Sequence, residues 1–162
     1  NTSPETMRIG AELIGFGFPF SKIIEESFYQ KTYLQNQILG RALMESIRIF
    51  DDRCIVSCID QKTMQLYQAQ PSDLDGIVNQ LRNCKGVDCA VLIYETETLE
   101  YKVSMRSNEN VDVAKVASFF GGGGHIRAAG CTMSGTLHDV IKHLSSQIVL
   151  QLKDGTGCIT ES

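Results

Sequence analysis

The chain has 162 residues, 43% of them hydrophobic, so it can bury the core of one domain, or of one domain and part of another. Its formal net charge of −4 argues against adhesion to long nucleic acid through many phosphate contacts, but a short anionic ligand in a local pocket stays compatible with it. No apolar run reaches the roughly 18 residues of a membrane span, and the N-terminus lacks the basic-then-apolar pattern of a secretory signal.

The first fifty residues have helical periodicity. Ser3-Pro4 predicts the start of a helix that Gly15-Phe16-Gly17 ends, and Ser21 predicts the start of a second one. The capping box Thr32-x-x-Gln35 opens a longer helix that we expect to run to about Phe50. This helix can be a core element or a strut between two domains, and its length, just before a change in composition, favours the strut.

Strands and helices alternate after residue 52. We expect strands over 53–59, 87–94, 99–105 and 129–134; the second of these is buried, and a turn over 95–98 joins it to the third. We expect helices over 62–69, 73–83 and 113–120, the last of them capped by Asp112. A final helix is opened by Thr136-x-x-Asp139. The pattern predicts the α/β class, with a mixed central sheet flanked by helices.

Six cysteines raise the question of a metal or disulfide framework, but none belongs to a Cys-x-x-Cys pair or has a histidine at a ligand-like spacing. Without a secretory signal, reduced thiols and a cytoplasmic location are the expectation. Cys54, Cys58, Cys89 and Cys131 lie in apolar runs, where cysteine packs as a small hydrophobic residue. The sequence therefore predicts structural cysteines and no metal site in this chain.

The segment from Phe119 to Gly130 contains four consecutive glycines, followed by His125 and then by Arg127. Glycines cost backbone entropy, and their unshielded N–H groups form a concavity that suits phosphate or carboxylate. Apolar residues lie close to both ends of this glycine segment, whereas the residues that flank a flexible linker are usually polar. We therefore favour an anion site over a flexible loop.

Arg106 and Ser107 end the second strand of the expected hairpin, ahead of the helix that leads into the glycines. A guanidinium offers a planar fork to phosphate, and a serine adds a hydroxyl donor. Each residue alone would be a solvated strand end or a turn. From strand order we expect Arg106 to lie near His125.

Together these motifs resemble the DHHA1 domain, the C-terminal substrate-binding half of DHH-family phosphoesterases, with the closest likeness to the nano-RNase type. The resemblance is carried by the glycine segment with His125 and Ala128-Ala129-Gly130, and by Val103-Ser104-Met105-Arg106-Ser107. The segment 1–14 is similar to the closing helices of a DHH domain. Enzymes of this type degrade very short oligoribonucleotides and remove the 3′-phosphate from 3′-phosphoadenosine 5′-phosphate.

The resemblance implies a division into helices of a truncated DHH domain (1–32), a helical connector (33–52), a DHHA1 domain (53–152) and a tail (153–162). It implies that Gly122, Gly123, Gly124 and His125 grip the phosphate and that Arg106 and Ser107 contact the nucleotide. Arg127 falls between matched positions and is the weaker candidate. The partners implied are short RNA or DNA oligonucleotides or nucleotide phosphates, with a homodimer allowed and no membrane.

Two manganese ions belong to the DHH half in this family, on aspartates and histidines that include an Asp-His-His triplet. This sequence has no such triplet, so we expect a fragment without catalytic residues that binds nucleotide weakly and hydrolyses nothing.

Alternatives within the family are a cyclic-dinucleotide phosphodiesterase, an exopolyphosphatase-like parent, or the tRNA-binding domain that ends alanyl-tRNA synthetases. A non-catalytic binding or dimerisation module is the alternative from another class. A nucleotide-loop NTPase is rejected, because no Gly-Lys-Ser/Thr follows the glycines.

Overall fold

The computed structural model describes residues 3–154. Two compact units divide the chain, Asn1–Tyr33 and Leu34–Ser162, and each is described by itself. Most of the tail predicted from residue 153, and Cys158 within it, lies outside the described residues. The predicted domain boundaries at residues 32 and 52 stay predictions.

The first unit consists of α1 (Pro4–Gly15), α2 (Phe20–Ile24) and a π-helical turn, η1 (Glu25–Tyr29). The side chain of Ser3 accepts a hydrogen bond from the Thr6 N–H at 3.1 Å, which confirms the predicted N-cap of α1. The second helix begins two residues earlier than predicted, because Pro19 and not Ser21 takes the N-cap position. No side chain of residues 3–33 is buried, so these helices have no core of their own.

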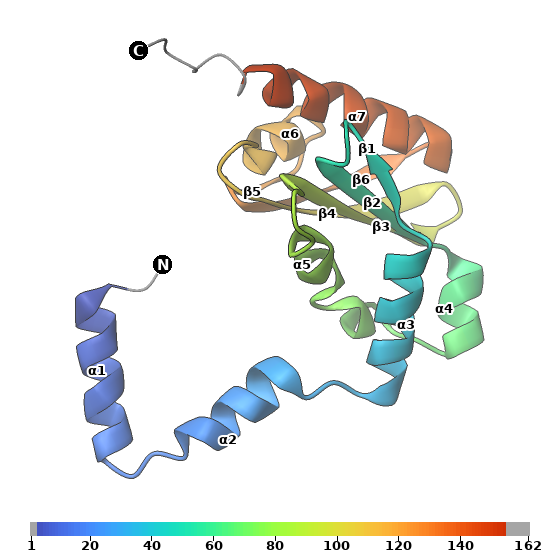
Figure 1. The fold of residues 1–162 in the computed structure, drawn as a ribbon. Coiled ribbons are helices and arrows are strands. Elements are labelled where there is room, and N and C mark those ends of the chain that lie inside the picture. The colour runs from blue at the N-terminus through green and yellow to red at the C-terminus, as the bar shows by residue number, and fades with distance from the viewer. Residues whose placement is uncertain (1–2, 155–162) are drawn as a thin grey trace, which may run out of the picture. The chain divides into compact units, whose positions relative to one another are not determined.

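The second unit is built on a mixed six-stranded sheet, as predicted, with the order β1-β2-β3-β4-β6-β5 (Figure 1). β2 and β3 are parallel, and the other neighbouring pairs are antiparallel. The strands are β1 (Ile47–Ile49), β2 (Cys54–Ile59), β3 (Cys89–Glu97), β4 (Glu100–Ser107), β5 (Gly123–His125) and β6 (Ala128–Ser134). Neither of the two edge strands, β1 and β5, was predicted from the sequence.

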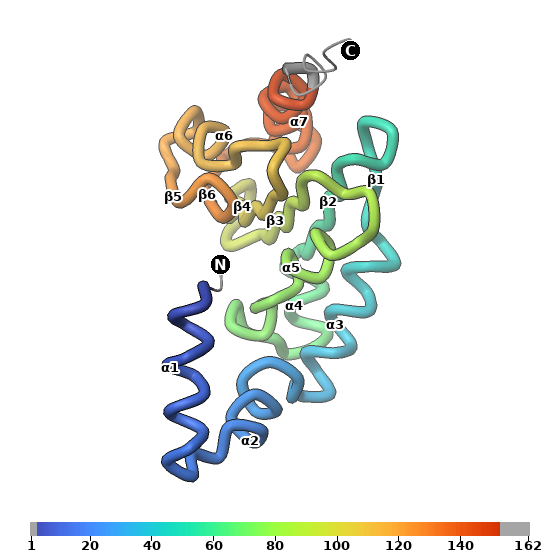
Figure 2. Tube along the Cα trace, turned by 60° about the vertical axis from the view of Figure 1, so that its left-hand side comes forward, coloured from blue at the N-terminus to red at the C-terminus, as the bar shows by residue number. Residues whose placement is uncertain are grey.

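Helices cover the two faces of this sheet. α6 (Val113–Phe119) and α7 (Leu137–Asp154) pack on one face, and α3 (Tyr33–Met44), α4 (Gln61–Tyr67) and α5 (Ile77–Arg82) pack on the other (Figure 2). Asp112 caps α6 as predicted, because its Oδ1 accepts from two backbone N–H groups. The predicted helix over 73–83 is divided into a 3₁₀ turn, η2 (Pro71–Leu74), and α5, since Gly76 has φ +88°.

The helix predicted to run to about Phe50 is shorter than expected, and it packs on the core of the second unit. α3 ends at Met44, and residues 47–49, which had been included in this helix, form β1 instead. Ile38 and Ala42 on α3 are fully buried in the core beneath β2 and β3, and the Ser57 hydroxyl donates to the Ala42 carbonyl at 2.9 Å. An apolar stripe on a helix looks the same in sequence whether it faces a core or another domain.

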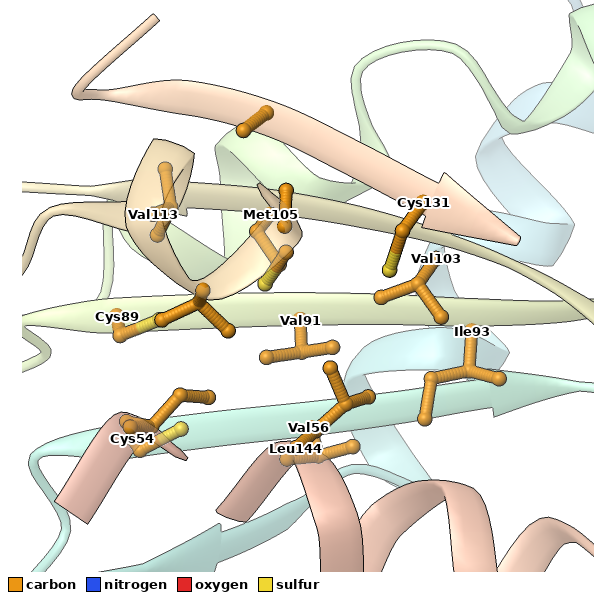
Figure 3. Packing of buried hydrophobic residues seen from close by; sticks show 14 of the residues in the cluster. Cys54, Val56, Cys89, Val91, Ile93, Val103, Met105, Val113, Cys131 and Leu144 are labelled. Atoms are coloured by element: carbon orange, nitrogen blue, oxygen red, sulfur yellow. The ribbon is translucent and has the colours of Figure 1, made fainter. Parts of the chain in front are cut away.

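The larger core lies between the sheet and the α6–α7 layer. Cys54, Cys89 and Cys131 are buried in it among valine, isoleucine and methionine side chains, which confirms their structural interpretation (Figure 3). Burial raises the pKa of the Cys131 thiol, and it raises that of Cys58 to about 11. These thiols are therefore protonated at neutral pH.

A buried carboxylate joins the start of β3 to the loop after β4. Asp88 accepts hydrogen bonds from Arg53 Nε at 2.6 Å, Asn108 Nδ2 at 2.7 Å and Asn110 Nδ2 at 2.8 Å. Burial would raise the pKa of Asp88, but the hydrogen bonds from these three side chains outweigh it and hold the pKa below its ordinary value. The network fixes the chain just beyond Arg106 and Ser107.

Asp88→Asn is expected to lower the free energy of unfolding by about 1–3 kcal/mol at neutral pH, because charge-assisted bonds are lost from a buried site. The depressed folded-state pKa stabilises the protein above the unfolded-state pKa of about 3.9, and this contribution disappears as the pH falls through the folded-state value. The difference between wild type and variant in urea denaturation should therefore shrink between about pH 5 and pH 2. Asp52→Asn, at an exposed ion pair with Arg48, is the control with little expected effect. A difference that does not change with pH would contradict this account.

Candidate functional site

On one face of the sheet, the helices bury apolar side chains against only half of the strands. The core under α3, α4 and α5 takes side chains from β2 and β3 and none from the described residues of β4, β5 or β6. A pocket of about 570 Å³ lies on these remaining strands. The bare face is thus the place where a ligand can reach the sheet directly.

Strand register arranges this face in three rows, because paired residues of antiparallel strands project to the same side. The rows, read from β4 across β6 to β5, are Lys102–Thr132, Ser104–Gly130–Gly123 and Arg106–Ala128–His125. All of these residues except His125 line the pocket. The middle row has no side chain larger than that of serine, which is why the face is hollow there.

The glycine segment closes the pocket at the end of α6. The N–H groups of Phe120 and Gly122 donate to the Ala117 carbonyl at 3.0 and 2.9 Å, and the Gly121 N–H donates to Ser118 at 3.1 Å. Gly121 has φ +75°, as expected of the residue that follows a helix C-cap, which here is Phe120. The premise that these N–H groups are free for an anion is therefore wrong for Gly121 and Gly122, because the last carbonyls of the helix already accept from them.

The last glycines pack against β6. A Cβ on Gly122 would overlap the Gly130 carbonyl and the Cys131 side chain, and one on Gly124 would lie 2.5 Å from the Ala128 carbonyl. Gly123 differs, because a Cβ there would meet open space. Gly123 and Gly124 belong to strand β5, so the expected loop is partly an edge strand, and of these two glycines Gly124 is the one required for close packing on β6.

Arg106 stands on the rim of the pocket in a fixed orientation. Its Nε donates to Asn79 Oδ1 on α5 at 3.0 Å, and its Nη1 donates to the Met105 carbonyl at 2.9 Å. Its Nη2 group makes no hydrogen bond to the described part of the chain. A guanidinium held in this way presents free N–H donors without the entropic cost of ordering a long side chain.

The other predicted site residues are placed differently. His125 is exposed and lies across Ala128 from Arg106, two strand spacings or about 10 Å away at Cα. Ser107 is buried, and its hydroxyl donates to the Ile126 carbonyl at 3.3 Å. Its N–H donates to the Arg127 carbonyl at 3.1 Å. Ser107, Gly124, His125 and Arg127 do not line the pocket, whereas Arg106, Gly122 and Gly123 do, and a role for any of them in binding stays a prediction.

Sequence reasoning missed Lys102, Ser104 and Thr132 as pocket residues. In the sequence, Lys102 and Ser104 alternate with apolar residues, a pattern that indicates only that one face of the hairpin is solvated. The same face continues onto β6 and β5 because of the order of the strands in the sheet. This order cannot be predicted from the residue pattern of one strand.

The described residues do not fit a metal centre, since residues 3–154 hold no group of three His, Cys, Asp or Glu side chains that could bind an ion. No helix in the same range is long and apolar enough to cross a membrane.

Comparison with known proteins places these features in a family. The model of the DHHA1 domain matches residues 51–150. The bifunctional oligoribonuclease and PAP phosphatase NrnA of Thermus thermophilus is 29% identical over 136 residues, which are 83% of this chain and 40% of that protein. The A-adding tRNA nucleotidyltransferase of Aquifex aeolicus is 28% identical over 116 residues, 70% of this chain and 14% of that protein.

A crystal structure of an exopolyphosphatase-related protein from Bacteroides fragilis has the same fold, with a TM-score of 0.87 at 21% identity over 96% of this chain and 46% of that one. The chain therefore spans less than half the length of each of these proteins.

Alanine at two adjacent glycines should separate packing from access to the pocket. Gly122→Ala forces a methyl group into β6 and should lower the free energy of unfolding by about 1–3 kcal/mol or more. Gly123→Ala should change it by less than about 1 kcal/mol, because the added methyl group meets no protein atom. Thermal or urea denaturation of both variants provides the comparison. Equal destabilisation by the two substitutions would show that the glycines are not differentiated in this way.

Proposed function

This chain belongs to the DHHA1 domain family, and on that premise we propose that it is the substrate-binding part of a DHH-family phosphoesterase that hydrolyses short oligonucleotides or nucleotide phosphates. The bare polar face of β4, β6 and β5 is the observation that carries this proposal. It joins a fixed guanidinium, a second cation and two hydroxyls around a floor that has no side chain larger than that of serine. A phosphate and the flat parts of a nucleotide can therefore approach the backbone closely.

The charge of the pocket differs from that of the whole chain. The formal net charge is −4, yet the ionisable groups lining the pocket are Lys102 and Arg106, together with the weakly acidic thiol of Cys131. Neither cation has a carboxylate within ion-pair distance among the described residues. Local positive charge on an acidic protein favours a short anionic ligand over a long polyanion.

The relative from Thermus thermophilus supports the choice of substrate, since it is named an oligoribonuclease and PAP phosphatase. By analogy we infer that very short oligoribonucleotides are the substrates, with 3′-phosphoadenosine 5′-phosphate as a second one. Manganese bound to the DHH half would activate the attacking water in the parent enzyme. The role of this chain is to bind and orient the nucleotide, and by itself we expect it to hydrolyse nothing.

Titration calorimetry with a 5′-phosphorylated adenylyl dinucleotide tests the proposal. We expect saturable binding that Arg106→Ala weakens about tenfold or more, because charge-assisted hydrogen bonds to phosphate are lost. His125→Ala tests the other side of the same row and should also weaken binding. Arg48→Ala removes an exposed arginine from β1 at the opposite edge of the sheet and should have no effect. Absence of binding by the folded chain, or equal affinities of Arg106→Ala and Arg48→Ala, would overturn the proposal.

Asn79→Ala probes the orientation of the guanidinium. Loss of the 3.0 Å contact with Arg106 Nε should weaken dinucleotide binding less than loss of the arginine itself does. Because Asn79 acts through Arg106, the double variant should bind as weakly as Arg106→Ala alone. Additive effects of the two substitutions would show instead that Asn79 contacts the ligand independently.

A further inference from the structure

The two cations of the pocket lie at opposite ends of its hollow floor. Lys102 and Arg106 are four residues apart on β4, which separates their Cα atoms by about 13 Å. Ser104, Gly130 and Gly123 form the row between them. Because this row has no side chain larger than that of serine, it leaves a trough across three strands, with one basic residue on each side of it.

The positions of the two cations are not interchangeable. The bonds from Arg106 to Asn79 and to the Met105 carbonyl hold its guanidinium at one end, so it cannot swing along the strand toward Lys102. A phosphate bound by the free edge of Arg106 is therefore placed at that end. Lys102 is left to bind a different anionic group.

The surroundings of Lys102 suit an anion. Its side chain is exposed and makes no ion pair with any carboxylate of residues 3–154. Thr132 is its neighbour in the same row, with a hydroxyl that can donate to the same group. Glu100, the next β4 residue on this face, accepts a hydrogen bond from the Thr96 hydroxyl at 3.1 Å and marks the outer limit of the basic surface.

We propose that Lys102 and Thr132 form a second anion subsite, so that the pocket binds a nucleoside carrying phosphates on both sides. The nucleoside lies over the row Ser104–Gly130–Gly123, one phosphate is bound at Arg106, and the other is bound at Lys102. This inference rests on the proposed function and adds to it a requirement for two phosphates. It also assigns binding roles to two residues outside the glycine–histidine motif.

The test compares a ligand with one phosphate to a ligand with two. Adenosine 5′-monophosphate and adenosine 3′,5′-bisphosphate are titrated by calorimetry into the wild-type chain and into Lys102→Gln, Thr132→Val and Arg106→Ala. Wild type should bind the bisphosphate about tenfold more tightly than the monophosphate. Lys102→Gln should abolish this gain while weakening the monophosphate much less than the bisphosphate, and Thr132→Val should reduce the gain. Arg106→Ala should weaken both ligands.

Two matched variants control for loss of charge. Lys142→Gln removes an exposed lysine from α7, which covers the opposite face of the sheet, and should leave the gain intact. Lys102→Arg keeps the charge and should retain most of the gain.

The outcomes separate the subsite from the function on which it rests. Equal binding of the two ligands by wild type, or a full gain in Lys102→Gln, would overturn the subsite, while weakening of both ligands by Arg106→Ala would leave the proposed function standing. Failure of the folded wild-type chain to bind either ligand would overturn both.

Discussion

Direct packing of glycine backbone on strand β6 is the constraint on which the candidate site depends. Gly122 and Gly124 lie so close to β6 that a Cβ on either would overlap its atoms. This contact holds β5 at the edge of the sheet, and Gly123 between them contributes backbone but no side chain to the pocket floor. The main role of the glycines is therefore to shape the surface of the pocket, and contacts with a ligand depend on that shape.

Two further features make this surface usable. The helices α3, α4 and α5 bury their apolar residues against β2 and β3, so the polar face of β4 and β6 stays open. The hydrogen bonds to Asp88 fix the loop after β4, while Asn79 fixes the guanidinium of Arg106. The site thus combines an open sheet face with side chains that are held before a ligand arrives, which lowers the entropic cost of binding.

Much of the fold is predictable from local patterns. Alternation and apolar runs located β2, β3, β4 and β6, and Asp112 marked the start of α6 because capping is a local interaction. The short edge strands β1 and β5 were missed, since three residues are too few for a periodicity and Gly123–Gly124 has no strand propensity. The inclusion of Lys102 and Thr132 in the pocket, and the burial of Ser107, depend on strand order and register, which no local pattern encodes.

The most direct test of the central claim maps where a nucleotide touches the chain. Amide chemical shifts are followed by NMR while a 5′-phosphorylated adenylyl dinucleotide is added. If the bare face is the site, the largest changes fall on Ser104, Arg106, Gly123 and Gly130, while the amides of α7 stay unchanged. Changes that gather instead around α7, or that are absent from β4 and β6 at saturation, would contradict the account.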